Sequence, residues 1–108
     1  MNIEKTKAQM RKGVLEFCIL AIIRNSEVYA SDIIDRLKEA ELIVVEGTLY
    51  PLLTRLKNDG LLSYRWEESR SGPPRKYYMI TEKGRSVLEG LNREWLNLVE
   101  SVNKIANN

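Results

Sequence analysis

The sequence predicts a mainly α-helical protein with one small β-hairpin. A helix with one apolar face ends near Asp59-Gly60, and two short strands joined by a basic turn follow it. The last segment has an apolar heptad pattern and no partner left within a chain of 108 residues. This order of parts is typical of a winged helix-turn-helix followed by a C-terminal dimerisation helix. We expect one compact unit in which residues 1–80 form the winged helix-turn-helix, with an N-terminal helix also at a dimer interface, and residues 81–108 form the dimerisation helix.

Length and composition exclude several kinds of chemistry. A chain of 108 residues supports one domain with a thin core, which association with a second copy would stabilise. There is no His and only one Cys, which excludes a His general base, a His–Cys zinc site and a Ser–His–Asp triad. Cys18 lies in the apolar run Leu15–Ile23 and is interpreted as a small core residue. The carboxylates are scattered, so we expect no catalytic residues, no metal site and no cofactor.

The sequence also predicts where the protein works. No apolar run approaches the roughly 18 residues of a membrane span. The first residues are charged and are not followed by the apolar core of a signal peptide. A lone Cys fits a reducing compartment. We therefore expect a cytoplasmic protein.

Charge is unevenly distributed along the chain. Residues 1–44 carry seven basic and seven acidic side chains, and residues 81–108 carry four of each. Residues 45–80 carry six basic and four acidic side chains, so they hold the whole net charge of +2. A local basic patch on a neutral body suits contacts with double-stranded DNA, although a solvated surface is the simpler alternative.

The first helix is expected from about Glu4 to Asn25. Its apolar residues recur at helical spacing in two stripes. Two stripes indicate burial on two sides, one against the domain core and the other against a second subunit. One stripe comprises Met10, Val14, Phe17, Cys18 and Ala21, and the other comprises Leu15, Ile19, Ile22 and Ile23.

Ser31 is expected to cap a second helix that runs through Ala40, with Asp32 near its positive end. A loop over Glu41–Val45 follows, in which Ile43–Val45 is a candidate short strand. The inward-facing positions of this helix are Ile33, Ile34, Leu37 and Ala40.

The third helix has a leucine stripe on one face and polar residues on the other. Thr48 is expected to cap it, which would place Pro51 in the first turn, where a missing N–H is tolerated. Asp59-Gly60 is expected to end it with a left-handed cap. The stripe is Leu49, Leu52, Leu53 and Leu56, and the outer face is Gly47, Tyr50, Pro51, Thr54, Lys57 and Asn58, with Thr48 and Arg55 at its edges.

Leu61–Glu67 and Lys76–Ile80 are expected to be the two strands of the hairpin. Glu68–Arg75 contains Ser-Gly-Pro-Pro, which is expected to continue neither strand and to form an exposed tip. Of Tyr77 and Tyr78, one is expected in the core. Trp66 is expected to pack against the domain. The cations Arg70, Arg75 and Lys76 are expected to be exposed at the tip of the hairpin.

Thr81 is expected to cap the last helix, of about 25 residues. Its apolar residues alternate at gaps of three and four, the rhythm of a coiled-coil seam. We expect a dimer interface here, and the alternative is a helix folded back on its own domain. Trp95 would lie near its symmetry mate, so two rings could form a slot for a planar apolar ligand, or simply fill the interface. The expected interface is Val14, Leu88, Leu91, Trp95, Leu98, Val102 and Ile105.

The third helix and the hairpin suit the surface of DNA. The major groove accepts one helix, and the flanking phosphates accept cations and neutral donors. A wing places its cations toward the minor groove or along a phosphate strand. The alternative is a winged helix that binds a protein, which would show apolar anchors on the third helix. The candidate DNA contacts are Thr48, Tyr50, Pro51, Thr54, Arg55, Lys57, Arg70, Arg75 and Lys76.

The same residues resemble a known family. The string Glu46-Gly47-Thr48-Leu49-Tyr50-Pro51-Leu52-Leu53, then Arg55-Leu56, Asp59-Gly60-Leu61, Arg75-Lys76-Tyr77-Tyr78 and Ile80-Thr81-Glu82-Lys83-Gly84 is similar to the signature of PadR-like transcriptional regulators. The resemblance covers essentially the whole chain and looks like the short form of the family with a single C-terminal helix. It implies a homodimeric repressor that binds a palindromic operator and leaves it when an effector binds.

The resemblance also implies an effector site. In a drug-responsive member, a pair of Trp residues from the last helices holds planar drugs at the dimer centre, and Trp95 matches that Trp. Met10 and Phe17 match positions that line the site, and Val99 stands where that member has an acid, so a preference for cations does not carry over. Tyr29-Ala30-Ser31-Asp32 departs from the family's Tyr-Gly-Tyr-Glu, which leaves the Ser31 hydroxyl to contact a phosphate.

Overall fold

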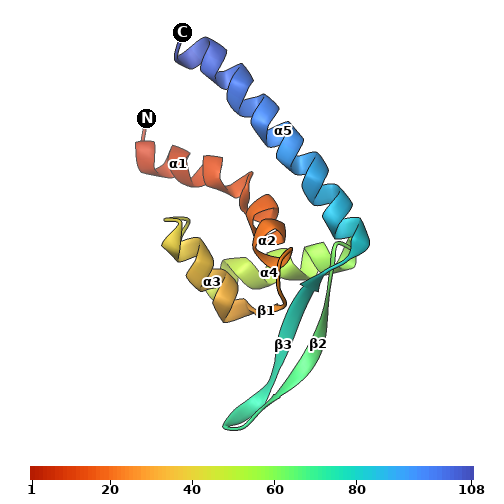
Figure 1. The fold of residues 1–108 in the computed structure, drawn as a ribbon. Coiled ribbons are helices and arrows are strands. Elements are labelled where there is room, and N and C mark those ends of the chain that lie inside the picture. The colour runs from red at the N-terminus through yellow and green to blue at the C-terminus, as the bar shows by residue number, and fades with distance from the viewer.

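The fold is a small helical domain with a hairpin at one end and a long helix at the other. The computed structural model describes all 108 residues. Helices α2, α3 and α4 pack together, the β2–β3 hairpin projects from one side, and α5 and α1 extend from the opposite side (Figure 1). The elements are α1 Ile3–Lys12, α2 Leu15–Ile23, β1 Val28–Tyr29, α3 Ala30–Glu39, α4 Glu46–Asn58, β2 Leu62–Ser69, β3 Gly72–Ile80 and α5 Glu82–Ala106. This architecture confirms the predicted fold class, and none of its helices is long and apolar enough to cross a membrane.

The core joins α2, α3, α4, the base of the hairpin and the first turns of α5. It is entirely apolar, and the leucine stripe of α4 lies at its centre, with Leu49, Leu53 and Leu56 at most 1% exposed. Leu20 is fully buried although it belongs to neither predicted stripe of its helix, because α2 packs between α3 and α5. The most completely buried side chains are Ile19, Leu20, Ile23, Ile33, Leu37, Leu49, Leu53, Leu56 and Leu62.

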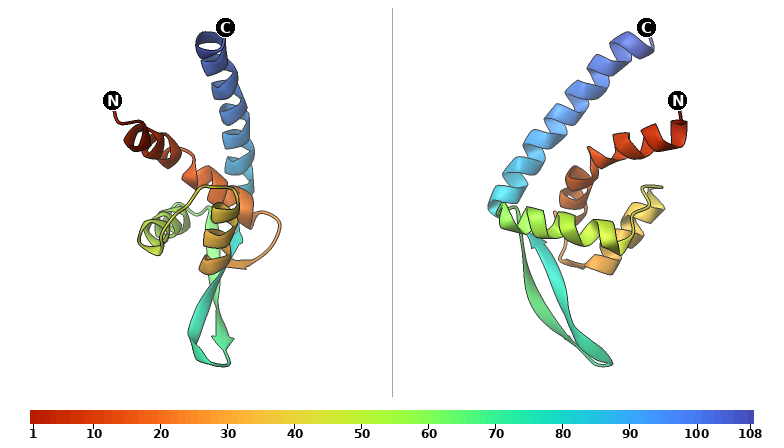
Figure 2. Two further views of the ribbon diagram at one scale, coloured as in Figure 1. Left: turned by 90° about the vertical axis from the view of Figure 1, so that its left-hand side faces the viewer. Right: turned by 180° about the vertical axis from the view of Figure 1, so that it is seen from behind.

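The first helix is broken, which corrects the prediction of one helix from Glu4 to Asn25. The break lies at Gly13-Val14, where the Val14 N–H donates to the Arg11 carbonyl at 3.1 Å in a tighter turn than an α-helix makes. Glycine is the least helix-favouring residue other than proline, so it is the natural place for the chain to bend. After the bend α2 enters the core, whereas α1 buries no residue and points away from the domain (Figure 2).

The second helix begins two residues earlier than predicted, because its cap is Tyr29 and not Ser31. Tyr29 precedes the helix, and the Asp32 carboxylate accepts the Tyr29 backbone N–H at 2.8 Å. Tyr29 is held extended because β1 pairs antiparallel with β3. The third strand of the sheet is therefore Val28–Tyr29 and not Ile43–Val45, which is a loop in which only Val44 is buried.

The third helix also begins earlier than predicted. It starts at Glu46, and the N–H groups of Thr48 and Leu49 both donate to the Val45 carbonyl at 3.0 Å, so Thr48 is not the cap. Pro51 therefore lies in the second turn. Its missing N–H leaves the carbonyl of Gly47 without a helical donor, and Gly47 is exposed, so water can satisfy that carbonyl.

The predicted left-handed end of the third helix is confirmed. Gly60 has φ +78°, and its N–H donates to the Lys57 carbonyl at 2.9 Å. The next N–H, that of Leu61, donates to the Leu56 carbonyl at 3.0 Å. These two bonds form a Schellman motif that turns the chain directly into β2.

The hairpin is longer than predicted, because β3 begins at Gly72 and contains Pro73 and Pro74. The expectation that these prolines would continue neither strand was wrong. The short β1 pairs only with Tyr77 and Tyr78, so the proline segment is a free edge where a missing N–H breaks no ladder. A bulge also places the two prolines opposite a single residue, between the pairs Glu67↔Arg75 and Ser69↔Gly72.

The last helix is anchored where α4 ends. As predicted, the Thr81 hydroxyl caps it, accepting the Gly84 N–H at 2.9 Å, and it also donates to the Gly60 carbonyl at 2.7 Å. The Lys83 ammonium donates to the Asp59 carbonyl at 2.8 Å. Beyond its buried Leu88 the helix leaves the domain, and exposure on its apolar face rises from 36% at Leu91 to 87% at Ile105. The helix is not folded back on its own domain (Figures 1 and 2).

Gly84→Ala tests this anchor. A Cβ at Gly84 would lie 2.0 Å from the Leu61 carbonyl oxygen, so backbone must move. We expect the free energy of unfolding to fall by about 3 kcal/mol or more, measured by denaturant titration at fixed protein concentration. Gly90→Ala is the matched control on the same helix, because its Cβ meets nothing closer than 3.9 Å and should leave stability unchanged or raise it by about 0.5–1 kcal/mol. Equal effects of the two substitutions would contradict a tight junction.

Candidate nucleic-acid interface

The outer face of α4 is open to solvent along its length. Burial of the leucine stripe turns the opposite side of the helix outward, where no other element covers it. Tyr50 is 45% exposed there, which is high for so large a ring. The predicted contacts Pro51, Thr54 and Lys57 are exposed on the same side, together with Gly47 and Asn58.

The two edges of this face have different neighbours. Lys57 lies toward the hairpin, with its ammonium 5.5 Å from the ring centroid of Tyr64. Arg55 lies toward α2, where it forms an ion pair with Glu16. Arg55 is therefore separated from the hairpin residues, although its side chain remains 60% exposed. Thr48 is exposed near the start of the helix.

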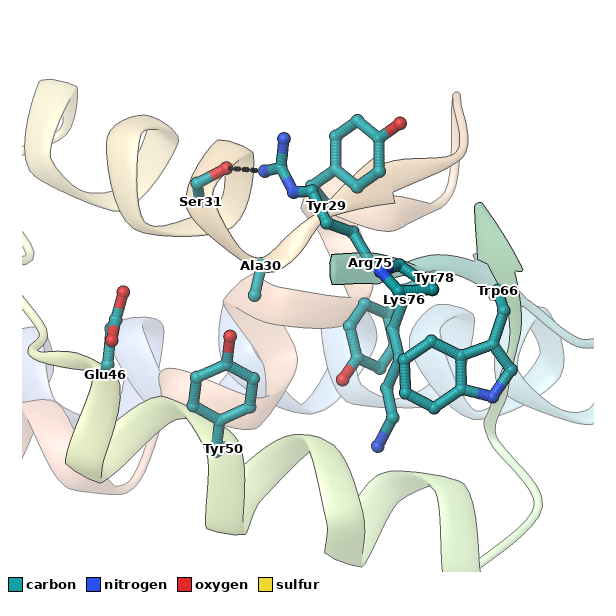
Figure 3. Close-up of a pocket in the computed structure, with 10 residues that line it drawn as sticks. Tyr29, Ala30, Ser31, Glu46, Tyr50, Trp66, Arg75, Lys76 and Tyr78 are labelled. Atoms are coloured by element: carbon teal, nitrogen blue, oxygen red, sulfur yellow. Dashed lines mark hydrogen bonds between the residues drawn. The ribbon is translucent and has the colours of Figure 1, made fainter. Parts of the chain in front are cut away.

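A hollow of about 380 Å³ lies between the start of α3, the face of α4 and the hairpin, and we call it the wing cavity (Figure 3). It brings together four of the predicted contact residues from three places in the sequence: Ser31, Tyr50, Arg75 and Lys76. The other lining residues are Tyr29, Ala30, Glu46, Trp66, Pro74 and Tyr78.

The two cations of the wing cavity rest on aromatic rings. The Arg75 guanidinium lies 3.9 Å from the ring centroid of Tyr29, and its Nη2 donates to the Ser31 hydroxyl at 2.8 Å. The Lys76 ammonium lies 4.5 Å from the ring centroid of Tyr64 and 5.5 Å from that of Trp66. Neither cation belongs to any of the four ion pairs in the structure. Aromatic rings therefore hold the cationic groups of Arg75 and Lys76 in position, and no carboxylate neutralises their charge.

Arg65 provides the contrast within the same hairpin. It alternates with Tyr64 and Trp66 along β2 and points to the other face of the strand. There it pairs with Glu27 at 2.9 Å and also with Glu67, and its guanidinium lies over the ring of Tyr77. The guanidinium donates hydrogen bonds to the carboxylates of Glu27 and Glu67, and these bonds raise the pKa of Arg65. Its charge is compensated within the protein.

The aromatic residues of the hairpin divide into core and surface. Tyr78 is 3% exposed, and burial, followed by the neighbouring Tyr50 and Tyr64, raises the pKa of its hydroxyl, so it stays neutral at physiological pH. The expectation that one of the two adjacent tyrosines enters the core is confirmed. The expectation that Trp66 packs against the domain was wrong, because Trp66 is 61% exposed. Strand alternation places Trp66 on the same face of β2 as the buried Leu62, so it could not have corrected the prediction. Trp66 is exposed because it lies farther along the hairpin, where it pairs with Lys76.

The remaining predicted contacts lie outside the wing cavity. Arg70 sits in the two-residue turn of the hairpin and is exposed, at the far end of the hairpin from α4. Arg75 and Lys76 were expected at that tip, but both lie within β3. The lengthening of β3 explains the difference.

A second hollow, of about 540 Å³, lies between α1 and α5, and we call it the α1–α5 groove. It brings together three of the four residues predicted to meet an effector, Met10, Trp95 and Val99. Phe17 is not among its lining residues, because the break in the first helix carries it onto α2, where it packs against the core. The remaining lining residues are Arg11, Gly13, Val14, Leu98, Val102 and Asn103.

Neither hollow holds the side chains of a metal site or a reactive thiol. No group of three or more Cys, Asp and Glu residues is placed to hold a metal ion. Cys18 is half-buried on α2, and burial raises the pKa of its thiol, which keeps it protonated at neutral pH.

Comparison with known proteins agrees with this geometry. A family model described as the transcriptional regulator PadR-like family matches residues 19–90. A PadR-like transcription factor from Bacteroides fragilis is 64% identical, with 94% of this chain and 99% of that chain covered and a TM-score of 0.80. A PadR family regulator from Eggerthella lenta is 31% identical, with 95% and 90% covered and a TM-score of 0.89. PadR of Bacillus subtilis, solved in complex with operator DNA, is 27% identical, with 77% of this chain and 47% of that chain covered and a TM-score of 0.66.

Proposed function

This chain belongs to the PadR-like family of transcriptional regulators, and on that basis we propose that it is a homodimeric repressor that binds a specific operator and is released by a small-molecule effector. The observation that carries the proposal is the open polar face of α4 beside two cations, Arg75 and Lys76, that have no carboxylate partner. The relative solved with operator DNA supports the same kind of ligand.

In this proposal α4 enters the major groove. Thr48, Tyr50 and Thr54 reach base edges or phosphates from the outer face, and Lys57 reaches the backbone. The ion pair of Arg55 with Glu16 is exposed and is worth at most about 1 kcal/mol, so a DNA phosphate can replace the carboxylate at low cost. A protein partner would instead require apolar anchors, and Tyr50 is the only large apolar side chain exposed on this face.

The hairpin lies beside α4 as a wing. Arg75 and Lys76 contact the phosphates nearest the helix, and Arg70 extends the contact from the hairpin turn. Ser31, already hydrogen-bonded to Arg75, adds a hydroxyl to the same phosphate contact.

A second copy of the chain covers the apolar face of α5. Trp95, Leu98 and Val102 are 40–56% exposed, and a continuous apolar stripe of this kind is rarely left in water. The heptad spacing suits pairing with a second helix, with Val14 and Leu91 at the margins. Two-fold symmetry then presents two α4 helices to half-sites of a palindrome, about 34–36 Å apart or a multiple of that distance.

The effector occupies the α1–α5 groove. Its lining by Met10, Trp95 and Val99 favours a planar apolar molecule, and Val99 offers no charge to select a cation. A ligand there favours one spacing of the two subunits over another, and release follows if the favoured spacing no longer matches the operator.

Tyr50→Ala tests the role of α4. We expect the dissociation constant for a duplex selected from a random library to rise about tenfold or more, because a base or backbone contact is lost, as measured by fluorescence anisotropy. Tyr50→Phe keeps the ring and separates the contribution of the hydroxyl. Sedimentation should show the same assembly for all three proteins. Unchanged affinity in Tyr50→Ala would remove this residue from recognition.

Arg75→Gln and Lys76→Gln test the wing. Each substitution should lower the slope of log Kd against log salt concentration by about 1, because one phosphate contact and its released counterions are lost. Lys104→Gln, near the end of α5 farthest from the hairpin, is the control and should leave the slope unchanged. Identical slopes for all three variants and the parent protein would place the phosphate contacts elsewhere.

Leu98→Glu tests the dimer. A carboxylate in the middle of the apolar seam should shift sedimentation from dimer to monomer at micromolar concentration, because an unpaired charge would be buried. Asn97→Glu introduces the same charge at the adjacent position, which lies off the seam, and should remain dimeric. A Leu98→Glu protein that stays dimeric would show that subunits meet through another surface.

A further inference from the structure

We propose that the wing cavity binds a small planar aromatic anion, and that such a ligand excludes DNA by occupying the residues that would hold it. The anion site rests on the cavity alone. Its consequence for DNA rests on the proposed function. This site is separate from the α1–α5 groove and shares no residue with it.

Charge in the wing cavity favours an anion. Arg75 lines it beside Tyr29 and Ser31, and Lys76 lines it beside Tyr64 and Trp66. Neither cation has a carboxylate partner, whereas Arg65 in the same hairpin has two. Glu46 also lines the cavity, but it forms no ion pair with either cation. The Ser31 hydroxyl lies 2.8 Å from Arg75 and can join a carboxylate held there. Hydrogen bonds from cations to a carboxylate are the strong class, and partial enclosure strengthens them.

The walls of the wing cavity favour an aromatic ring. Tyr50 and Trp66 come from α4 and β2, and their rings are 45% and 61% exposed. Figure 3 shows the rings of Tyr50, Tyr78 and Trp66 and the ammonium of Lys76 around one hollow. A volume of about 380 Å³ falls within the usual range for small-molecule sites, so there is room for two fused rings that carry one carboxylate.

The same residues explain why the ligand would compete with DNA. Tyr50, Arg75 and Lys76 are each assigned to the operator in the proposed function. A ligand bound to these side chains prevents Arg75 and Lys76 from contacting a DNA phosphate. It also covers the ring of Tyr50 on the outer face of α4. Release by this route needs no change of subunit spacing, unlike release from the α1–α5 groove.

The binding test uses 2-naphthoate as the anion and 2-naphthamide as its neutral analogue, titrated calorimetrically into the full-length protein. We expect 2-naphthoate to bind about tenfold more tightly than the amide, because only the acid meets the two cations with a charge. Lys76→Gln and Arg75→Gln should each weaken 2-naphthoate about tenfold and leave the amide unchanged. Arg65→Gln is the matched control, a hairpin cation outside the cavity, and should bind 2-naphthoate like the parent protein.

The position of the ligand is read from the two tryptophans, Trp66 and Trp95, which give two indole N–H signals in an NMR spectrum. The Trp66 signal, assigned with Trp66→Phe, should shift during the 2-naphthoate titration while the Trp95 signal stays in place. A shift of Trp95 alone, or equal affinity for acid and amide, would overturn the anion site.

A third measurement separates this inference from the proposed function. Direct competition makes the apparent Kd for the selected duplex rise in proportion to 2-naphthoate concentration without a limit, whereas coupling between separate sites reaches a plateau. A plateau or no effect, with Trp66 still responding, would overturn competition and leave the anion site. If no duplex binds at all, the proposed function fails, and the calorimetric and NMR results still decide whether the anion site exists.

Discussion

The close packing of Gly84 against the Leu61 carbonyl connects the three working parts of this molecule. A Cβ at Gly84 would lie 2.0 Å from that oxygen, so only glycine allows α5 to start against the end of α4. The Leu61 carbonyl also accepts the Thr81 N–H at 3.2 Å, and Gly60 and Asp59 accept from Thr81 and Lys83. Helix α4, the β2–β3 hairpin and helix α5 therefore meet at one rigid junction. Backbone contacts with the Leu61 carbonyl fix their relative directions, and hydrogen bonds from the side chains of Thr81 and Lys83 reinforce them.

Pairing within the protein decides which of its cations can meet an anion. Arg65 and Arg55 both have carboxylate partners, Arg65 in Glu27 and Glu67 and Arg55 in Glu16. Arg75 and Lys76 are held instead by aromatic rings, which orient a cation without cancelling its charge. The whole chain has a net charge of only +2, but two cations without carboxylate partners line one cavity together with exposed aromatic rings. This is why one cavity can be assigned both to a DNA phosphate and to a small anion.

The small core explains why the chain exposes so much apolar surface. Sixteen apolar side chains form the buried cluster, and the outer half of α5 and all of α1 contribute none of them. The seam of α5 and the neighbouring α1–α5 groove are left in solvent by this chain alone. A second copy would supply the missing cover, and the groove beside Trp95 would then lie next to the contact between subunits. Stability, assembly and ligand binding would depend on the same surface.

Local sequence patterns were strong enough to predict the leucine stripe of α4, its Asp59-Gly60 end, the Thr81 cap and the heptad helix. Prediction failed where long-range pairing overrode local preference. Strand β1 holds Tyr29 extended and starts α3 before Ser31, and pairing on one side only lets Pro73 and Pro74 enter β3. Sequence also identified the cations of the candidate site, but not that Arg55 is paired, that Arg75 and Lys76 are free, or that Trp66 faces their cavity. Those facts depend on which side chains from distant segments meet, and the folding of the chain sets these contacts.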